Sequence, residues 1–112
     1  MTEKIVMAQL EKISKGHYIL KGQLNFESVP ELWLQNKGAE DKSALFADDS
    51  NTLDIDLSQL ERSDSSGLAM LVEWYREAEQ RDKRITFFNL PAQMYDIARM
   101  SGLDEILPLA KK

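Results

Sequence analysis

Two short apolar strands separated by an amphipathic helix place the strongest constraint on how this chain folds. Leu53–Leu57 alternates apolar and acidic residues, which is the period of a β-strand with one covered face. Arg84–Leu90 is a β-branched and aromatic run that predicts a second strand. Between them, apolar residues recur with helical spacing up to about Arg81, at Leu68, Leu71, Val72 and Tyr75. Strand, helix and strand in this order predict a parallel pair joined by a right-handed crossover.

The N-terminal part of the chain predicts a β-hairpin followed by a short helix. Apolar and polar residues partly alternate over Val6–Ile13 and Tyr18–Leu24, with turn residues between the two segments. Ser28 and Glu31 have the spacing of a capping box, so we expect a helix from Val29 to about Lys37.

A loop and a C-terminal helix complete the expected order of elements. Ala39–Asn51 is acidic and rich in small residues, which predicts a loop held in place by Leu45 and Phe46. Pro91 favours the start of a helix and Gly102 its end. The sequence therefore predicts an α/β sandwich.

Composition limits the classes of function. The 112 residues suit one compact domain, residues 1–112, and the net charge of −5 without a basic cluster argues against nucleic acid as a partner. The chain has no cysteine, which excludes disulfides, thiolate nucleophiles and zinc–thiolate sites within it. No apolar run has the length of a signal peptide core or a membrane span, so we expect a cytoplasmic protein that reaches a membrane only through a partner.

The turn that opens the central helix is the main candidate for a functional site. It places Asp64, Ser65, Ser66 and Gly67 where the first amide N–H groups of a helix have no intrahelical acceptor. Helix capping requires only one such residue, so we favour a role in recognition for the others. The free N–H groups also favour an anion here, such as a phosphate on Ser65.

A second apolar feature runs along one flank of the same helix. At about 100° per residue, Ser66, Met70 and Trp74 fall on one side, away from Leu68 and Leu71. Either Trp74 packs into the edge of the core, or Met70 and Trp74 form an exposed anchor of the kind found at protein interfaces. The candidate contact residues are Asp64, Ser65, Ser66, Gly67, Ala69, Met70, Glu73 and Trp74.

The remaining polar residues do not form a complete catalytic set. Asp54 and Asp56 share a strand face and, with Asp64, suggest a metal or phosphoryl-transfer pocket like that of a receiver domain. The strand at residues 84–89 lacks the lysine at its end that such a pocket would carry, so we interpret Asp54 and Asp56 as solvated. His17, the only histidine, lies in a predicted turn. We therefore expect no enzymatic activity, no metal and no cofactor.

Three segments of the chain resemble STAS domains. Asp64–Leu68, following the strand and turn at 53–58, is similar to the signature of this family. Lys21–Leu24 resembles its second strand, and Ala98–Leu103 resembles its last helix and the turn after it. The resemblance implies a STAS-type sandwich with a mixed sheet of about four to five strands and helices mainly on one face.

The resemblance also implies two alternative functions. The pattern from Leu57 to Leu71 is most similar to MlaB-type domains, the STAS subunits of a phospholipid ABC transporter that maintains outer-membrane asymmetry. Such a subunit binds and supports the ATPase at the cytoplasmic face of the inner membrane, with Ser65 in the contact. The alternative is an anti-sigma-factor antagonist, in which a partner kinase phosphorylates Ser65.

Overall fold

The computed structural model describes residues 8–37 and 45–111, and the side chains of residues 8–32 and 45–111. In chain order the elements are β1 (Ala8–Ser14), β2 (His17–Leu24), α1 (Ser28–Lys37), the 3-10 helix η1 (Leu45–Ala47), β3 (Thr52–Asp56), β4 (Leu60–Ser63), α2 (Ser65–Gln80), β5 (Arg84–Phe88), α3 (Ala92–Met100), the 3-10 helix η2 (Leu103–Glu105) and β6 (Leu109–Ala110). The predicted hairpin, central strand, central helix and C-terminal helix are therefore all present.

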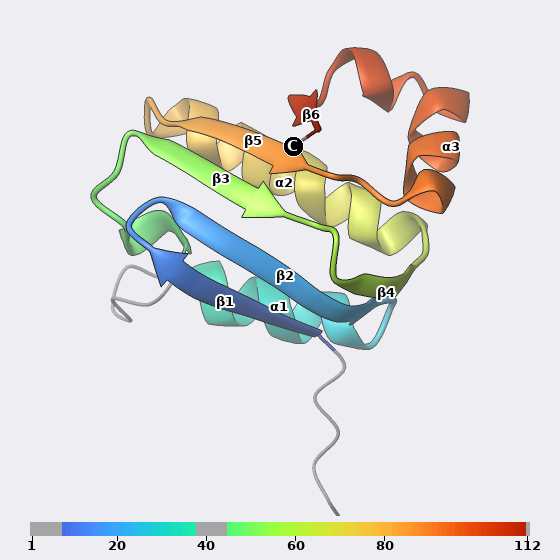
Figure 1. Ribbon diagram of the computed structural model, residues 1–112, viewed down its shortest axis with the longest axis horizontal. Coiled ribbons are helices and arrows are strands. Elements are labelled where there is room, and N and C mark those ends of the chain that lie inside the picture. The colour runs from blue at the N-terminus through green and yellow to red at the C-terminus, as the bar shows by residue number, and fades with distance from the viewer. Residues whose placement is uncertain (1–7, 38–44, 112) are drawn as a thin grey trace, which may run out of the picture.

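The strands form one mixed sheet in which β2 has two neighbours on the same side. The first residues of β2 pair in parallel with β3, and its last residues pair in parallel with β4. β1 pairs antiparallel with β2, and β3, β5 and β6 run parallel, in the order β1-β2-β3-β5-β6. The predicted parallel arrangement of the strands around α2 is confirmed. β4 brings the chain to the start of α2 beside the end of β2 (Figure 1).

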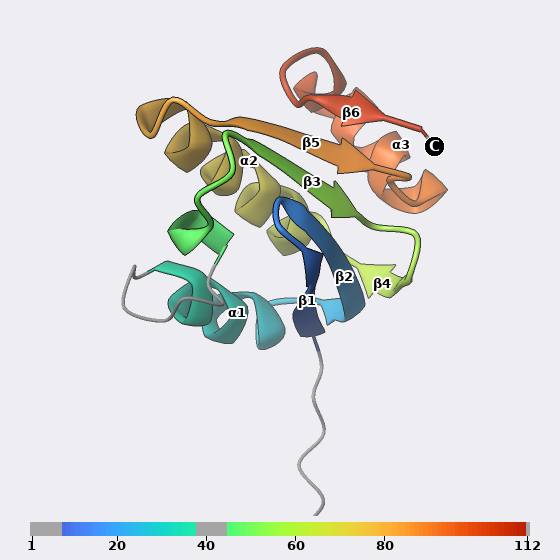
Figure 2. The ribbon, with the colours of Figure 1, turned by 60° about the vertical axis from the view of Figure 1, so that its left-hand side comes forward.

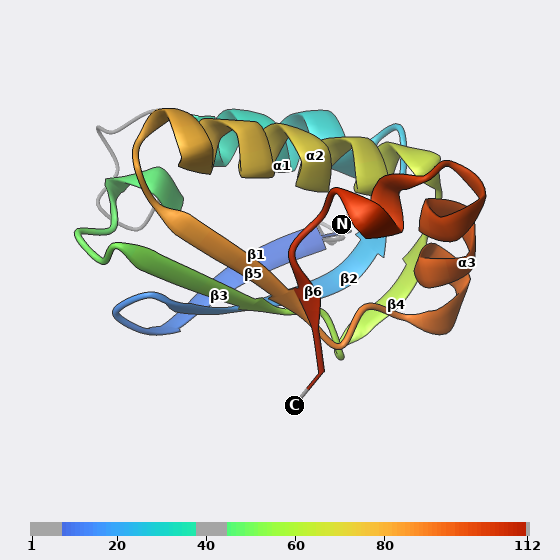
Figure 3. The same cartoon turned by 90° about the horizontal axis from the view of Figure 1, so that it is seen from above.

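Two helices cover one face of this sheet. Figure 3 shows α1 and α2 side by side above the strands, while α3 packs at one end of the sheet. Figure 2 shows the same layers from the side, with β6 at the edge of the sheet next to β5. The predicted location of the helices is thus confirmed. The largest fully buried side chains between the layers are Trp74, Tyr18, Phe87, Leu20, Leu24, Leu32, Leu45, Leu53, Ile55, Leu57, Leu68 and Met70.

The sheet has six strands rather than the expected four to five. Beyond the four strands that the sequence predicted by residue range there are β4 and β6, and β4 lies within the segment that the sequence predicted as a turn. Leu60 and Ser63 face inward while Glu61 and Arg62 are exposed. A four-residue strand with two charged residues at its centre has no recognisable period, and its pairing with the distant β2 stabilises it instead.

The start of α1 is capped by Asn25 rather than by the predicted box of Ser28 and Glu31. The Asn25 side-chain oxygen accepts hydrogen bonds from the N–H groups of Glu27 and Ser28, both at 2.9 Å. The Ser28 hydroxyl is buried and donates to the Gln23 carbonyl at 2.7 Å. Asn is as good a cap as Ser, so the two alternatives are close in propensity and the backbone path out of β2 selects Asn25.

The buried stripe of α2 is rotated from the predicted one. Leu68 and Leu71 are buried as expected, but Val72 and Tyr75 are only half-buried. The buried residues of α2 include a second stripe, Gly67, Leu71, Trp74 and Ala78. This stripe also has helical spacing, and it places the small residues at both ends and the indole between them.

The loop after α1 is attached to the body of the protein as predicted. Leu45 and Phe46 are buried, and Arg81 lies over the Phe46 ring at 5.7 Å from its centroid. The part of the predicted loop at residues 39–44 lies outside the described residues. At the other end of the chain, Gly102 follows α3 with a φ of +74°, which confirms its predicted role as the residue that ends the helix.

Candidate functional site

The turn into α2 is held by hydrogen bonds to the end of β2 and within itself. The Asp64 N–H donates to the Leu24 carbonyl at 3.0 Å. The Asp64 carboxylate is the N-cap of α2: its Oδ1 accepts from the Ser66 N–H at 2.8 Å and also from the Ser66 hydroxyl. Capping therefore accounts for both Asp64 and Ser66.

Gly67 has a packing role. It is buried, and a Cβ built at this position would lie 2.2 Å from the Ser63 Oγ and 2.9 Å from the Leu24 Cβ. The first turn of α2 thus approaches the ends of β2 and β4 more closely than any residue with a side chain allows. Gly67 shapes the turn from inside, and it offers no exposed surface to a partner.

Ser65 differs from its neighbours because nothing in the described part of the chain uses its hydroxyl. It is the first residue of α2 and is exposed. No hydrogen bond to its side chain occurs among the described residues. Of the four residues of the turn, Ser65 is therefore the one whose side chain the fold leaves available for another molecule.

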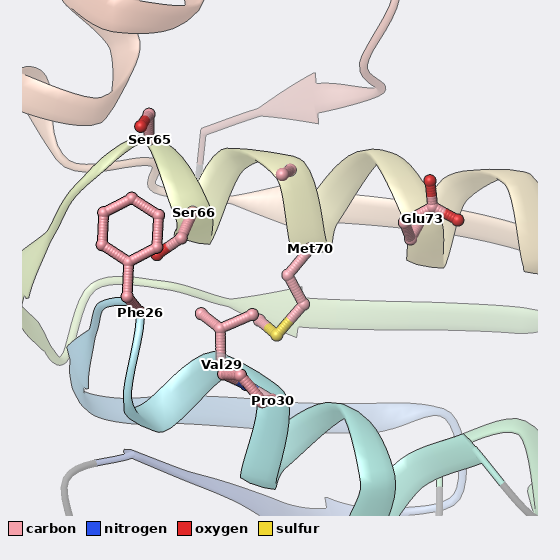
Figure 4. Close-up of a pocket in the computed structure, with 8 residues that line it drawn as sticks. Phe26, Val29, Pro30, Ser65, Ser66, Met70 and Glu73 are labelled. Carbon is pink, nitrogen blue, oxygen red and sulfur yellow. The ribbon is translucent and has the colours of Figure 1, made fainter.

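An apolar groove of about 390 Å³ begins beside Ser65 and runs between the first turn of α1 and the N-terminal half of α2 (Figure 4). The turn before α1 supplies Phe26, whose ring stands next to Ser66 in Figure 4. The Met70 side chain reaches toward Val29 across the gap between the helices. The residues that line the groove are Phe26, Val29, Pro30, Ser65, Ser66, Ala69, Met70 and Glu73.

The structure decides between the two alternatives for Met70 and Trp74. Trp74 is 1% exposed and belongs to the hydrophobic core, so it is not a surface anchor. Met70 is 2% exposed, and what remains accessible of it forms part of the groove. The exposed aromatic side chain among the residues that line the groove is Phe26, at 76%.

The aspartates of β3 are bound to neighbouring polar groups. Asp54 lies 3.5 Å from the Nδ1 of His17, and the Asp56 Oδ1 accepts from the Ser58 N–H at 2.9 Å and the Asn89 amide at 3.1 Å. Across residues 8–37 and 45–111, no three His, Cys, Asp or Glu side chains gather closely enough to hold a metal ion. Within the same ranges, no helix is long and apolar enough to cross a membrane.

One buried carboxylate lies at the opposite end of the strands. Asp48 accepts hydrogen bonds through Oδ2 from the Gly16 N–H and the Tyr18 hydroxyl, both at 2.8 Å, and through Oδ1 from the Ser50 N–H at 2.8 Å. The Lys12 ammonium lies 3.3 Å away. Burial alone raises the pKa of Asp48, but these donors outweigh it and hold the pKa well below its usual range. Burial, together with the bond to Asp48, raises the pKa of the Tyr18 hydroxyl.

The chain, which includes this turn, matches a known protein family over most of its length. The family model described as "Mlab, STAS domain" matches residues 15–108 of the chain. The chain belongs to the MlaB-type STAS domain family. No curated protein matches it in sequence.

Solved structures show the same STAS fold. SpoIIAA, an anti-sigma factor antagonist, is 20% identical in its unphosphorylated form, covering 94% of this chain and 87% of that chain with a TM-score of 0.69. The phosphorylated form of Bacillus SpoIIAA is 21% identical, with coverages of 94% and 90% and a TM-score of 0.67. A chain of the Acinetobacter MlaFEDB complex in an ATP-bound conformation is 28% identical, covering 84% and 93% with a TM-score of 0.69.

Three of the residues that line the groove were not among the contact residues predicted from the sequence: Phe26, Val29 and Pro30. A signal was present, because Phe26 is an aromatic residue between the polar Asn25 and Glu27 in a turn. That signal has little weight alone, since single exposed apolar residues are common. Phe26 becomes a candidate only because the fold brings it beside Ser65, which is about 40 positions later in the chain.

Proposed function

We propose that this STAS domain is a non-enzymatic subunit that binds and supports the ATPase of a phospholipid ABC transporter. The observation that carries the proposal is the free hydroxyl of Ser65 at the mouth of an apolar groove with Phe26 exposed beside it. A contact surface commonly combines an apolar centre, an aromatic anchor and a few polar groups at its edge. The 28% identity to a chain of the MlaFEDB complex supports the choice of partner.

The proposed contact surface is smaller than the sequence indicated. It consists of Ser65, Ala69 and Glu73 from α2 and of Phe26 and Pro30 from the α1 side, with Met70 at the floor of the groove. Asp64, Ser66 and Gly67 hold this surface in place. In this proposal the protein is cytoplasmic and reaches the inner membrane through the transporter.

We expect Ser65→Glu to weaken binding to the transporter ATPase of the same organism by at least tenfold. A carboxylate at Ser65 would be desolvated in the contact without a partner, which opposes binding. The same carboxylate is favourable at a helix N-terminus, so the variant retains its fold. Copurification and an equilibrium affinity measurement check this result. The matched control is Ser14→Glu, an exposed residue at the β1–β2 turn; equal binding by both variants and wild type contradicts the proposal.

A second candidate function is an anti-sigma-factor antagonist that is switched by phosphorylation of Ser65. The specific observation in its favour is that Ser65 is exposed and free, whereas the Ser66 hydroxyl is bound to Asp64. A phosphate would add about 1.5–2 negative charges at neutral pH.

Intact-mass measurement on protein from its native cell separates the two functions. For the antagonist we expect the mass of one phosphate, lost in Ser65→Ala and kept in Ser66→Ala. For the transporter subunit we expect the unmodified mass under growth conditions in which the ATPase copurifies.

A further inference from the structure

The groove beside Ser65 carries charge at one end only. Of the residues that line it in the described part of the chain, only Glu73 is charged. The Glu73 carboxylate is half exposed and lies 3.4 Å from the guanidinium of Arg76, whose side chain is 69% exposed. An exposed pair of this kind contributes little to stability, so Glu73 is available to a cation on another molecule.

The apolar and acidic ends of the groove are separated along α2. Ser66 lies in the first turn of α2 with Phe26 beside it, and Glu73 lies about two turns further along the same helix, as Figure 4 shows. At a rise of 1.5 Å per residue, the seven steps from Ser66 to Glu73 span about 10 Å along the helix axis. The groove therefore distinguishes the two ends of a segment that lies along it.

Phe26 is held on a rigid turn although its ring is exposed. The Asn25 cap binds the N–H groups of the two residues that follow Phe26, which fixes the backbone on its C-terminal side. An aromatic side chain on an ordered backbone loses little conformational entropy when a partner covers it. It is therefore suited to be the apolar anchor of the groove.

We propose that the groove binds a segment of the ATPase that carries an apolar side chain against Phe26, beside Ser66, and a lysine or arginine about 10 Å away, beside Glu73. This inference rests on the proposed function and adds the chemistry and direction of the partner segment. Charge complementarity supports it, because the only charge among the described residues that line the groove is negative and the chain as a whole carries −5. Complementary charges steer association and fix the register of a contact.

The test measures the affinity of the full chain for the purified ATPase at about 50 mM and about 500 mM salt, where the screening length falls several-fold. The variants are Glu73→Lys, Glu73→Gln and Phe26→Ala. The matched control is Glu61→Lys, an exposed residue of β4 that does not line the groove. All three substituted positions are exposed, and thermal unfolding confirms that each of the four variants is folded.

We expect Glu73→Lys to weaken binding at least tenfold at low salt, Glu73→Gln to weaken it less, and both effects to shrink at high salt. Phe26→Ala should weaken binding at least tenfold at both salt concentrations. Glu61→Lys should stay within about twofold of wild type.

Two results overturn the inference while the proposed function stands. The first is that wild type binds the ATPase and Glu73→Lys binds equally well or better. The second is that only Phe26→Ala weakens binding, which shows an apolar occupant without a cation. Failure of the wild-type chain to bind the ATPase overturns the proposed function itself, and the inference with it.

Discussion

Trp74→Ala is expected to lower the free energy of unfolding by about 3–5 kcal/mol, the usual cost of deleting a buried aromatic side chain. Trp74 is 1% exposed and sits on the sheet-facing side of α2 among the core residues. Its removal leaves a cavity that the surrounding side chains fill only in part. Urea unfolding followed by far-UV circular dichroism measures the change.

The matched control for this experiment is Phe26→Ala, which deletes an aromatic side chain that is 76% exposed. We expect it to change the free energy of unfolding by less than about 1 kcal/mol, since substitutions at exposed positions cost little. If Trp74→Ala is as stable as wild type and loses only partner binding, the indole belongs to the surface and the packing of α2 described above is wrong.

Trp74 also shows why periodicity alone did not fix the buried face of α2. Two stripes with helical spacing exist on this helix, one through Val72 and Tyr75 and one through Trp74 and Ala78. The structure buries the second stripe, and Gly67 at its start has no side chain, which lets the first turn approach Leu24. That contact joins residues more than 40 positions apart, so no local pattern contains it.

Strands with a clear period were predictable, and the short strand beside them was not. β3 alternates buried Leu53 and Ile55 with half-buried acids, and β5 alternates buried Ile85 and Phe87 with half-buried Thr86 and Phe88. β4 is too short to show a period, and it exists because the end of β2 is available to pair with it. The sequence therefore predicted the architecture but not the feature that positions the candidate site.

The turn into α2 is present where the sequence predicted it, while the roles of the residues within it required coordinates. Asp64, Ser65 and Ser66 are all polar residues at a helix start, and any of them suits a cap. The structure assigns the cap to Asp64 and binds Ser66 to it, which leaves Ser65 free. Recognition by Ser65 stays a prediction, and the proposed contact now includes Phe26, which local sequence could not connect to it.

Asp48→Asn is expected to destabilise the protein by about 3–5 kcal/mol, as the loss of a buried, fully bonded charge usually does. The carboxylate joins the β1–β2 turn, through Gly16 and Tyr18, to the segment that enters β3, through Ser50. In the sequence Asp48 resembled a solvated loop residue because Gly16 and Tyr18 lie 32 and 30 positions away. The Asp49→Asn variant, at the exposed neighbouring position, is the matched control and should be close to wild type.

The contribution of Asp48 should also depend on pH in one direction. Its pKa is lowered in the folded protein, so the carboxylate binds a proton less readily there than in the unfolded chain, where the value is about 3.9. The stability difference between wild type and Asp48→Asn is therefore fully present above about pH 5 and shrinks as the pH falls below about 4. Urea unfolding of both proteins between about pH 3 and pH 7 measures this difference. A difference that stays constant over that range would show that Asp48 binds a proton equally well in the folded and unfolded states, and one that grows toward low pH would show that the folded state binds it more tightly. Either result would show that the charge of Asp48 does not stabilise the fold.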